Sequence, residues 1–188
     1  METNNNTHVC PWWMGYALLI PFRKYYHNPE RILSPYIKPG MIVMDYGSAM
    51  GYFSIPLAKI VGDNGMVYCV DLQDKMLSTL KKRAARYNVS NIIRPLKVGG
   101  NYNVPELQDT LDFVLLFYVA HEVPDQAGLF KDLHTMLKPG GKILFAEPKG
   151  HVMRQDFNRS LNLAQHAGLE VIHKNTDIKG LSVTLQKP

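Results

Sequence analysis

Cysteine is scarce in this sequence of 188 residues, which has only Cys10 and Cys69. Neither residue belongs to a Cys-x-x-Cys pair or to a spacing of Cys and His that is typical of zinc sites. The sequence therefore excludes a disulfide-stabilised scaffold and predicts no metal site. We expect both side chains to be reduced thiols.

A long apolar run is also absent. The longest one, from Trp12 to Phe22, has eleven residues and is interrupted by Gly15 and Pro21, whereas a membrane-spanning helix needs about 20. The residues before it include Glu2 but no Lys or Arg, unlike a secretory signal. We therefore expect a cytoplasmic protein with no segment inserted in a membrane.

The sequence has little excess of charge of one sign, because 21 Lys and Arg residues stand against 16 Asp and Glu residues, for a net charge of +5. The densest basic cluster consists of Lys81, Lys82, Arg83 and Arg86, and it is typical of the exposed face of a helix. A nucleic-acid partner is therefore not expected. A phosphate-binding patch is the alternative interpretation of this cluster.

From residue 39 onward the sequence alternates regularly between buried strands and amphipathic helices. Uninterrupted apolar runs such as 41–44 and 66–70 are typical of buried parallel strands. This alternation predicts an α/β fold with a doubly wound, mostly parallel sheet of seven strands. The expected strands are 41–44, 66–70, 91–97, 111–117, 142–146, 170–175 and 181–186, and the expected helices are 51–61, 73–87, 126–137 and 153–166.

The first 37 residues do not follow this alternation. Their apolar and aromatic residues have mixed spacing and are cut by Pro21, Pro29 and Pro35, which predicts short helices. We therefore expect an N-terminal helical cap segment at residues 1–37 and a main domain at residues 38–188. The absence of internal repeats and of a flexible linker predicts that both parts form one compact unit.

The loop of residues 45–53, DYGSAMGYF, follows the first expected strand and leads into a helix. Gly47 and Gly51 permit positive φ angles and a close approach of a ligand to the backbone, and a helix start supplies N–H donors. The functional interpretation is a cradle for a small molecule. A tight turn without a ligand is the alternative.

The spacing in this loop disfavours two classes of cofactor. A dinucleotide-binding fingerprint has glycine at the first, third and sixth places, where this sequence has Gly47, Ala49 and Tyr52. The sequence also has no Gly-Lys-Ser or Gly-Lys-Thr triplet, so hydrolysis of a nucleoside triphosphate is disfavoured.

Asp71 follows the second expected strand directly. A carboxylate at this place can accept hydrogen bonds from both hydroxyl groups of a ribose. An aspartate is also a common N-terminal cap of a helix, and Asp71 precedes one. Together with the glycine-rich loop, Asp71 favours a nucleoside-containing ligand.

Four segments in this order resemble the class I S-adenosylmethionine-dependent methyltransferases, in particular the small single-domain branch that includes quinone-biosynthesis enzymes. The segments are VMDYGSAMG at 43–51, VDL at 70–72, LDFV at 111–114 and LKPGGK at 137–142. The resemblance covers about residues 38–148. It implies a Rossmann-like methyltransferase fold, S-adenosylmethionine as the cofactor, and direct in-line methyl transfer to an acceptor that is expected to be a small molecule.

The resemblance also implies which residues bind the cofactor. The loop after the first strand would hold the methionine end, Asp71 the ribose, and the end of the fourth strand the sulfonium. The adenine would be held either by the amide oxygen of Asn101 or by the backbone and apolar packing from Leu72 and Met76. The family commonly has glycine in place of Ala49 and Gly-Asp-Ala in place of the segment at 99–101. The implied cofactor-binding residues are Asp45, Gly47, Ser48, Ala49, Gly51, Asp71, Leu72, Met76, Gly100, Asn101 and Phe117.

His121 follows the fourth expected strand, where the family lines the acceptor pocket. An imidazole titrates near neutral pH and can take a proton from an acceptor, which makes His121 the candidate catalytic base. A structural histidine that anchors the loop is the alternative. Glu147, at the end of the fifth strand, is a further pocket candidate, although a glutamate in a loop is often only solvated.

Two other functions remain open from the sequence. The first is a binding module that keeps the fold without catalysis, suggested by the missing aspartate after the third strand. The second is a nicotinamide-dependent oxidoreductase, which the glycine spacing disfavours.

Overall fold

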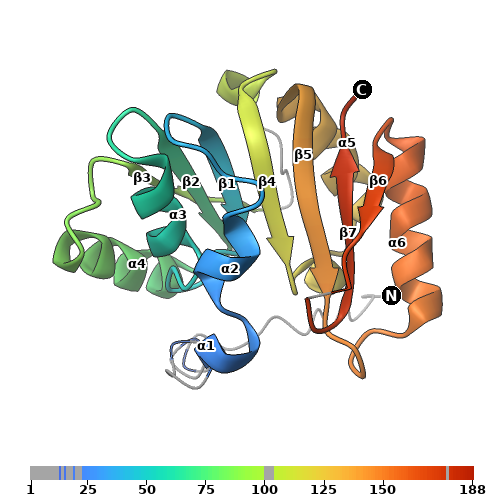
Figure 1. Ribbon diagram of the computed structural model, residues 1–188, viewed down its shortest axis with the longest axis horizontal. Coiled ribbons are helices and arrows are strands. Elements are labelled where there is room, and N and C mark those ends of the chain that lie inside the picture. The colour runs from blue at the N-terminus through green and yellow to red at the C-terminus, as the bar shows by residue number, and fades with distance from the viewer. Residues whose placement is uncertain (1–12, 14, 16–18, 20–22, 100–103, 177) are drawn as a thin grey trace, which may run out of the picture.

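The computed structural model describes residues 13, 15, 19, 23–99, 104–176 and 178–188 (Figure 1). These residues form one seven-stranded sheet with the strand order β3-β2-β1-β4-β5-β7-β6. Strands β1 to β5 pair in parallel, whereas β7 runs antiparallel to β5 and β6. The strands are β1 (Ile42–Tyr46), β2 (Met66–Asp71), β3 (Ile93–Lys97), β4 (Leu111–Phe117), β5 (Leu137–Glu147), β6 (Glu170–Lys174) and β7 (Leu181–Gln186).

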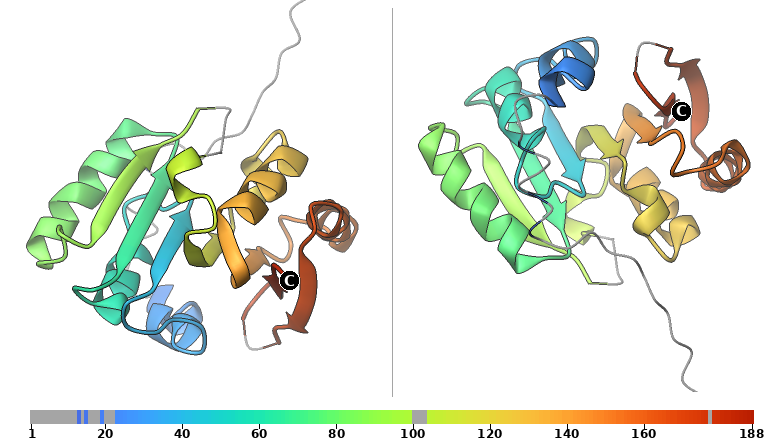
Figure 2. Two further views of the ribbon diagram at one scale, coloured as in Figure 1. Left: turned by 90° about the horizontal axis from the view of Figure 1, so that it is seen from above. Right: turned by 90° about the horizontal axis from the view of Figure 1, so that it is seen from below.

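Helices cover both faces of this sheet (Figure 2). One buried cluster packs α2, α3 and α4 against one face, and a second cluster packs α5 and α6 against the other. The predicted doubly wound, mostly parallel α/β fold is therefore confirmed. The described helices are α1 (Arg23–Tyr26), α2 (Pro29–Leu33), α3 (Ser54–Val61), α4 (Asp74–Arg86), α5 (Gln126–Met136) and α6 (Arg154–His166), with short 3₁₀ turns η2 (Pro105–Leu107) and η3 (Ala120–Glu122).

Helices α1 and α2 lie within the segment that the sequence predicts to be a cap, most of which falls outside the described residues. The boundary at residue 37 stays a prediction. Within the described part of the chain, no helix combines the length and the apolar character needed to cross a membrane.

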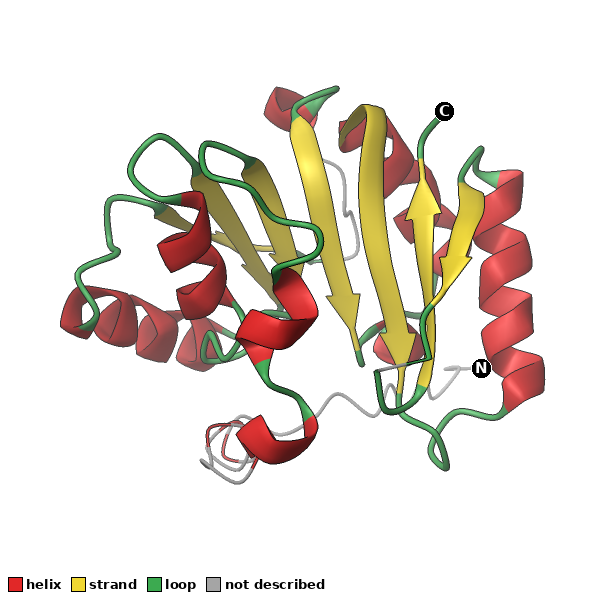
Figure 3. Ribbon diagram, in the orientation of Figure 1, coloured by secondary structure: helices red, strands yellow, loops and turns green. Residues whose placement is uncertain are grey.

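The strand order places the site of this fold at one edge of the sheet. The chain moves outward from β1 to β3 and then returns to β4 on the other side of β1, so the order reverses between β1 and β4. Ligands of such sheets bind beyond the carboxyl ends of the strands at this reversal. Figure 3 shows that β1, β2, β4 and β5 end at the same edge.

Two predicted elements have wrong bounds for identifiable reasons. The expected helix 51–61 begins only at Ser54, because Gly51 has a φ of 80° and belongs to the preceding turn. The expected strand 142–146 is longer, because β5 already pairs at Leu137 with Leu111 and then shifts register before Lys142 pairs with Phe113. The Pro-Gly-Gly segment is thus an irregularity within β5.

An ion pair fixes that irregular start of β5. Lys138 Nζ lies 2.6 Å from one carboxylate oxygen of Asp112 in β4, and the other oxygen accepts a hydrogen bond of 2.8 Å from the backbone N–H of Ile42 in β1. One carboxylate thus connects the beginnings of β1, β4 and β5. This contact links the LKPGGK and LDFV segments in the structure.

The packing of α5 against the sheet gives a first prediction. Phe130 is fully buried and meets the ring of Phe145 edge to face, with a centroid distance of 5.6 Å. Phe130→Ala should lower the free energy of unfolding by about 3 to 5 kcal/mol, because it removes apolar contacts and leaves a cavity. Urea denaturation measures this change. The control Tyr25→Ala removes an aromatic ring that is 81% exposed, and a comparable loss there would contradict the assignment of the core.

Candidate cofactor site

A cavity of about 210 Å³ lies at the carboxyl ends of β1, β2 and β4, where the strand order reverses. Eight of the eleven predicted cofactor-binding residues line it. They are Asp45, Gly47, Ser48, Ala49, Asp71, Leu72, Met76 and Phe117. Gly51 is not part of the wall, and Gly100 and Asn101 lie outside the described residues.

The glycine-rich loop is held by the end of β2. The backbone N–H groups of Gly47 and Ser48 both donate to the carbonyl oxygen of Val70, each over 2.9 Å. The N–H group of Ala49 donates to Oδ2 of Asp71, also over 2.9 Å. Three backbone N–H groups of the loop therefore serve to fix its path.

Asp71 lies between this loop and α4. Its Oδ1 accepts a hydrogen bond of 2.9 Å from the N–H group of Gln73, and Gln73, not Asp71, is the N-terminal cap of α4. Burial raises the pKa of Asp71, while the backbone N–H groups of Gln73, Ala49 and Leu72 act in the opposite direction. Because a carboxylate offers about four lone-pair sites, Asp71 keeps capacity to accept from a ligand in the cavity.

The two glycines of the loop serve different purposes. Gly47 has a φ of 75°, and a Cβ atom there would lie 2.5 Å from Cγ2 of Val119 in the loop after β4. Gly51 has a φ of 80°, and a Cβ atom there would lie 3.1 Å from Cγ of Leu80 in the core. Gly47 thus permits close contact between two walls of the cavity, whereas Gly51 permits packing of α4.

Ser48 shows that the cradle suits a polar ligand. Its side chain is only 4% exposed and lines the cavity. Its hydroxyl is the one buried side-chain polar group, among the described residues, that has no hydrogen-bond partner. A buried hydroxyl without a partner costs free energy, and a polar group of a bound ligand would remove that cost.

The wall beyond Asp71 is apolar. Leu72 is 44% exposed although it is a large hydrophobic residue, and it lines the cavity together with Met76 and Val98. These side chains can cover a flat aromatic ring. This is the place that the sequence predicts for adenine, although the predicted contacts of Gly100 and Asn101 stay untested.

Asp45 connects the end of β1 to the start of α3. Its buried carboxylate accepts a hydrogen bond of 2.5 Å from the Ser54 hydroxyl, at the start of α3. The neighbouring Cys69 is fully buried, and this burial strongly raises the pKa of its thiol. Within the described ranges, no group of three His, Cys, Asp or Glu side chains is arranged to hold a metal ion.

The end of β4 forms the opposite wall, and here the structure adds residues that the sequence analysis missed. Tyr118 has a φ of 62°, which is unusual for a bulky residue. Its hydroxyl donates to the carbonyl oxygen of Lys179 and accepts a hydrogen bond of 3.0 Å from Nε2 of His27. The hydroxyl of Tyr52 donates to the carbonyl oxygen of His27 over 2.8 Å. Two tyrosines of the cavity wall therefore fasten the segment at residue 27.

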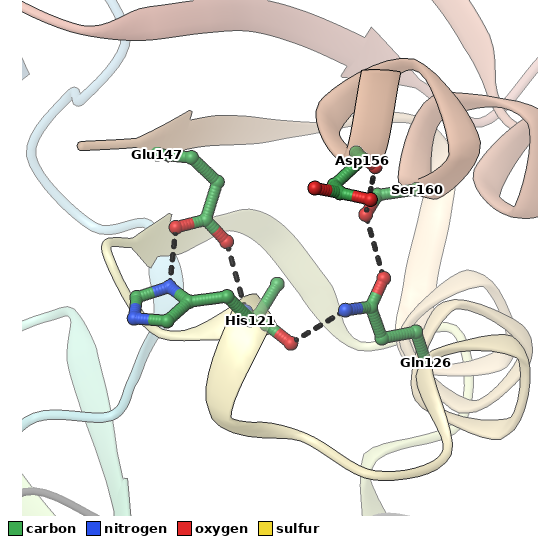
Figure 4. Close-up of polar contacts among 6 residues, drawn as sticks. His121, Gln126, Glu147, Asp156 and Ser160 are labelled. Atoms are coloured by element: carbon green, nitrogen blue, oxygen red, sulfur yellow. Dashed lines mark hydrogen bonds and ion pairs between the residues drawn. The ribbon is translucent and has the colours of Figure 1, made fainter. Parts of the chain in front are cut away.

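His121 does not line this cavity. It lies on the other side of the same loop, in a second cavity that it shares with Glu147 and with residues of α5 and α6. Nδ1 of His121 lies 2.7 Å from Oε2 of Glu147, and the backbone N–H of His121 donates to Oε1 over 3.0 Å (Figure 4). The hydrogen bond to Glu147 raises the pKa of His121, against the opposite effect of burial. Its catalytic role stays a prediction.

The fold and this cavity together define a Rossmann-like methyltransferase domain. The chain belongs to the family described as a methyltransferase domain, whose model matches residues 20–175. The architecture is also that of a SAM-dependent methyltransferase from Aquifex aeolicus, with a TM-score of 0.84 and 22% identity over 96% of this chain and all of that one. The resemblance predicted from the sequence is therefore confirmed at the level of family and fold.

Two curated relatives are similar over a smaller part of their length. A demethylmenaquinone methyltransferase from Lysinibacillus sphaericus is 30% identical over 111 residues, which are 59% of this chain and 46% of the relative. A ubiquinone/menaquinone biosynthesis C-methyltransferase from a Shewanella species is 26% identical over 144 residues, which are 74% of this chain and 57% of the relative. The chain spans about half the length of the curated relatives it matches.

Ala49 gives a prediction on the stability of the loop. It has a φ of 46°, a left-handed conformation that costs an L-residue about 1 to 2 kcal/mol. Ala49→Gly relieves this strain but adds freedom to the unfolded chain, so the free energy of unfolding should rise by roughly 0.5 to 1 kcal/mol. Urea denaturation measures the change. The control Ala85→Gly, at an exposed position in α4, should instead lower it by about 0.5 to 1 kcal/mol. Equal signs for the two variants would contradict the strain at Ala49.

Proposed function

We propose that this chain binds S-adenosylmethionine in the cavity at the carboxyl ends of β1, β2 and β4 and transfers its methyl group to a small-molecule acceptor. One observation carries the proposal. A single cavity joins the glycine-rich loop, the carboxylate of Asp71 and the aromatic end of β4, and it contains the buried, unpartnered hydroxyl of Ser48. Location in the cytoplasm and the lack of a nucleic-acid partner stay predictions of the sequence.

The residues of the cavity fit the parts of this cofactor. The remaining lone pairs of Asp71 would accept the two ribose hydroxyls, and Leu72 and Met76 would cover the adenine ring. The Ser48 hydroxyl and the glycine-rich loop would face the methionine end. The walls at Gly47 and Val119 touch closely, which would limit the freedom of the bound molecule.

The chemistry requires little covalent help from the protein. The bound cofactor supplies a methyl group on a positively charged sulfur, which is a good leaving group. The chain's own task is to hold the acceptor in line with that bond, and positioning of this kind can lower a barrier by on the order of 7 to 11 kcal/mol. A base is needed only when the acceptor carries a proton.

A flat aromatic hydroxyl compound is the acceptor class to test first. Five aromatic side chains line the cavity: Tyr46, Tyr52, Phe53, Phe117 and Tyr118. Such side chains favour stacked or edge-to-face contacts with an aromatic ring. The names of both curated relatives also refer to quinone compounds, which supports an aromatic acceptor of this kind. The Shewanella relative is named a C-methyltransferase, whereas the atom proposed for methylation here is a hydroxyl oxygen.

Calorimetry separates this function from its alternatives. Binding of S-adenosylmethionine and S-adenosylhomocysteine, without binding of NAD, is expected. Binding of NAD alone would favour the oxidoreductase. Binding of the two adenosyl compounds without methyl transfer to any of a panel of hydroquinones, catechols and amines would favour a binding module.

Asp71 gives a prediction on cofactor affinity. Asp71→Asn removes the charge and replaces one acceptor oxygen by a donor group, so the affinity for S-adenosylhomocysteine should fall about ten- to a hundredfold, or roughly 1.5 to 3 kcal/mol. Isothermal calorimetry measures it. The matched control is Asp74→Asn, because Asp74 is exposed and forms an ion pair with the exposed Lys97. If both variants bind as the native protein does, the ribose assignment is wrong.

Gly47 gives a prediction with an internal control for backbone strain. Gly47→Ala places a Cβ atom 2.5 Å from Val119, whereas Gly40→Ala, at a similar φ of 82°, meets nothing within 4 Å. Both variants should lose some stability, because both backbones are left-handed. Only Gly47→Ala should lower the affinity for S-adenosylhomocysteine, by about tenfold or more, since it pushes the loop after β4 out of place. Equal affinities in the two variants would count against this cradle.

A further inference from the structure

The pair of His121 and Glu147 joins the ends of two adjacent parallel strands. β4 and β5 are in register up to Phe117 and Ala146, so the residue that ends β5 lies beside the turn that follows β4. Glu147 is only 1% exposed, and both of its carboxylate oxygens contact His121. Oε1 accepts a hydrogen bond from the backbone N–H of His121, and Oε2 lies 2.7 Å from its Nδ1. This carboxylate therefore acts on one side chain.

We infer that His121 is the base that takes the acceptor's proton and that Glu147 is the positioning residue that prepares it. The inference rests on the proposed function, since it concerns the acceptor in methyl transfer. It assigns a task to Glu147 and states which nitrogen of His121 reacts.

The hydrogen-bond pattern fixes the tautomer of the imidazole. An ionised carboxylate only accepts hydrogen bonds, so Nδ1 of His121 must carry the hydrogen that faces Glu147. The neutral ring then has its lone pair on Nε2. A base whose ring is held in this tautomer needs no rearrangement before it accepts a proton.

The direction of the ring agrees with this role. Figure 4 shows the imidazole of His121 pointing to the left, away from Gln126 and Ser160 on the right. Gln126 holds the loop backbone by donating to the carbonyl oxygen of Ala120 over 2.9 Å and accepting from the Ser160 hydroxyl over 2.6 Å. The ring of His121 meets the ring of His151 edge to face at 4.9 Å. Polar contacts of the loop backbone thus leave the imidazole directed away from Gln126 and Ser160.

The same loop connects His121 to the cofactor cavity. Val119, Glu122, Val123 and Pro124 line that cavity, and His121 lies between them in the chain. The base is therefore separated from the proposed methyl site by one turn of backbone. An acceptor that reaches over this turn would meet both the methyl group and Nε2.

The charges around His121 make it a stronger base than a free histidine. Its hydrogen bond with Glu147 raises its pKa, burial lowers it, and the charges of Glu147 and Glu122 raise it. The other titratable groups nearby are His151, which packs on its ring, and those that line the second cavity, Asp125, Asp156 and Arg159. The rate of proton removal should therefore rise with pH, with a midpoint above the ordinary pKa of about 6.5.

Methyl transfer and proton removal both take place at the hydroxyl group of the acceptor. A lone pair of the acceptor oxygen forms the bond to the methyl carbon while the bond between that carbon and sulfur breaks, with its electron pair left on sulfur. The proton of the acceptor hydroxyl passes to Nε2 of His121. Glu147 stabilises the resulting imidazolium, and the proton then leaves to solvent.

Glu147→Gln tests the tautomer directly. The backbone N–H of His121 is always a donor, so it retains the amide oxygen of the new glutamine and leaves the NH₂ group facing Nδ1. This arrangement forces Nδ1 to accept and moves the hydrogen to Nε2. Nitrogen-15 NMR of the histidine ring, without any ligand, should show an Nδ1–H tautomer in the native protein and an Nε2–H tautomer with a lowered pKa in the variant. Asp156→Asn, which removes a charge from the second cavity without touching His121, should behave as native.

Kinetics tests the role in methyl transfer. The probes are S-adenosylmethionine and 1,4-dihydroxynaphthalene, a soluble hydroquinone, under single-turnover conditions. Glu147→Gln should slow the transfer by about tenfold or more, and His121→Asn by roughly 10² to 10⁴. His121→Asn is informative because the asparagine NH₂ group can still donate to Glu147, so the contact between the strands is kept while the base is lost. Affinity for S-adenosylhomocysteine should stay within about twofold in both variants.

The possible outcomes are distinct. An Nε2–H tautomer in the native protein overturns the inference. A His121→Asn protein that transfers methyl groups at the native rate also overturns it, because the contact between His121 and Glu147 would then be only structural. If the native protein methylates the probe but Glu147→Gln keeps its rate and pH profile, this inference fails and the proposed function stands. If the native protein binds no S-adenosylmethionine, or methylates no member of the panel of hydroquinones, catechols and amines, the proposed function fails, and the base role of His121 fails with it.

Discussion

The end of β2 holds the glycine-rich loop, and the cavity depends on this connection. The loop follows an unfavourable path, because Gly47 and Ala49 both have positive φ angles. Three backbone N–H groups stabilise that path by donating to the carbonyl oxygen of Val70 and the carboxylate of Asp71. Such contacts are available only because β2 is the parallel neighbour of β1. Since Asp71 both fixes the loop and faces the cavity, ligand affinity and the local stability of the loop are coupled through one side chain.

The sheet was the most predictable part of the structure. Strands β4 and β7 have the predicted bounds, because each is a continuous buried run with clear turns on both sides. The predictions failed where backbone conformation overrides composition. Gly51 delays the start of α3 through its left-handed φ, and β5 begins at Leu137 and continues through Pro139 and the two following glycines, before the predicted start at residue 142. Neither effect leaves a signal in the pattern of apolar residues.

The candidate site was predictable where it follows from topology and not where it follows from distant contacts. Asp71 and Phe117 end neighbouring parts of a parallel sheet, so they face the same edge by necessity. By contrast, Tyr118 binds His27 and Lys179, which are 91 and 61 residues away, and no local pattern connects these positions. Tyr52 was the one residue of this set that the sequence singled out, because it stands where a dinucleotide fingerprint has glycine. In the structure, its hydroxyl donates to the carbonyl oxygen of His27.

The two carboxylates at the ends of β2 and β5 have different roles, because they differ in the groups that their oxygens contact. Asp71 accepts hydrogen bonds from the backbone N–H groups of Ala49 and Gln73 and lines the cavity, so its carboxylate also faces a ligand bound there. Glu147 is almost fully buried and both of its oxygens contact His121, so it would act on a ligand only through the imidazole. The loop that carries His121 also touches the cradle, because Val119 fills the space beside Gly47. The short loop after β4 therefore both shapes the cradle, through Val119, and sets the direction of the imidazole of His121.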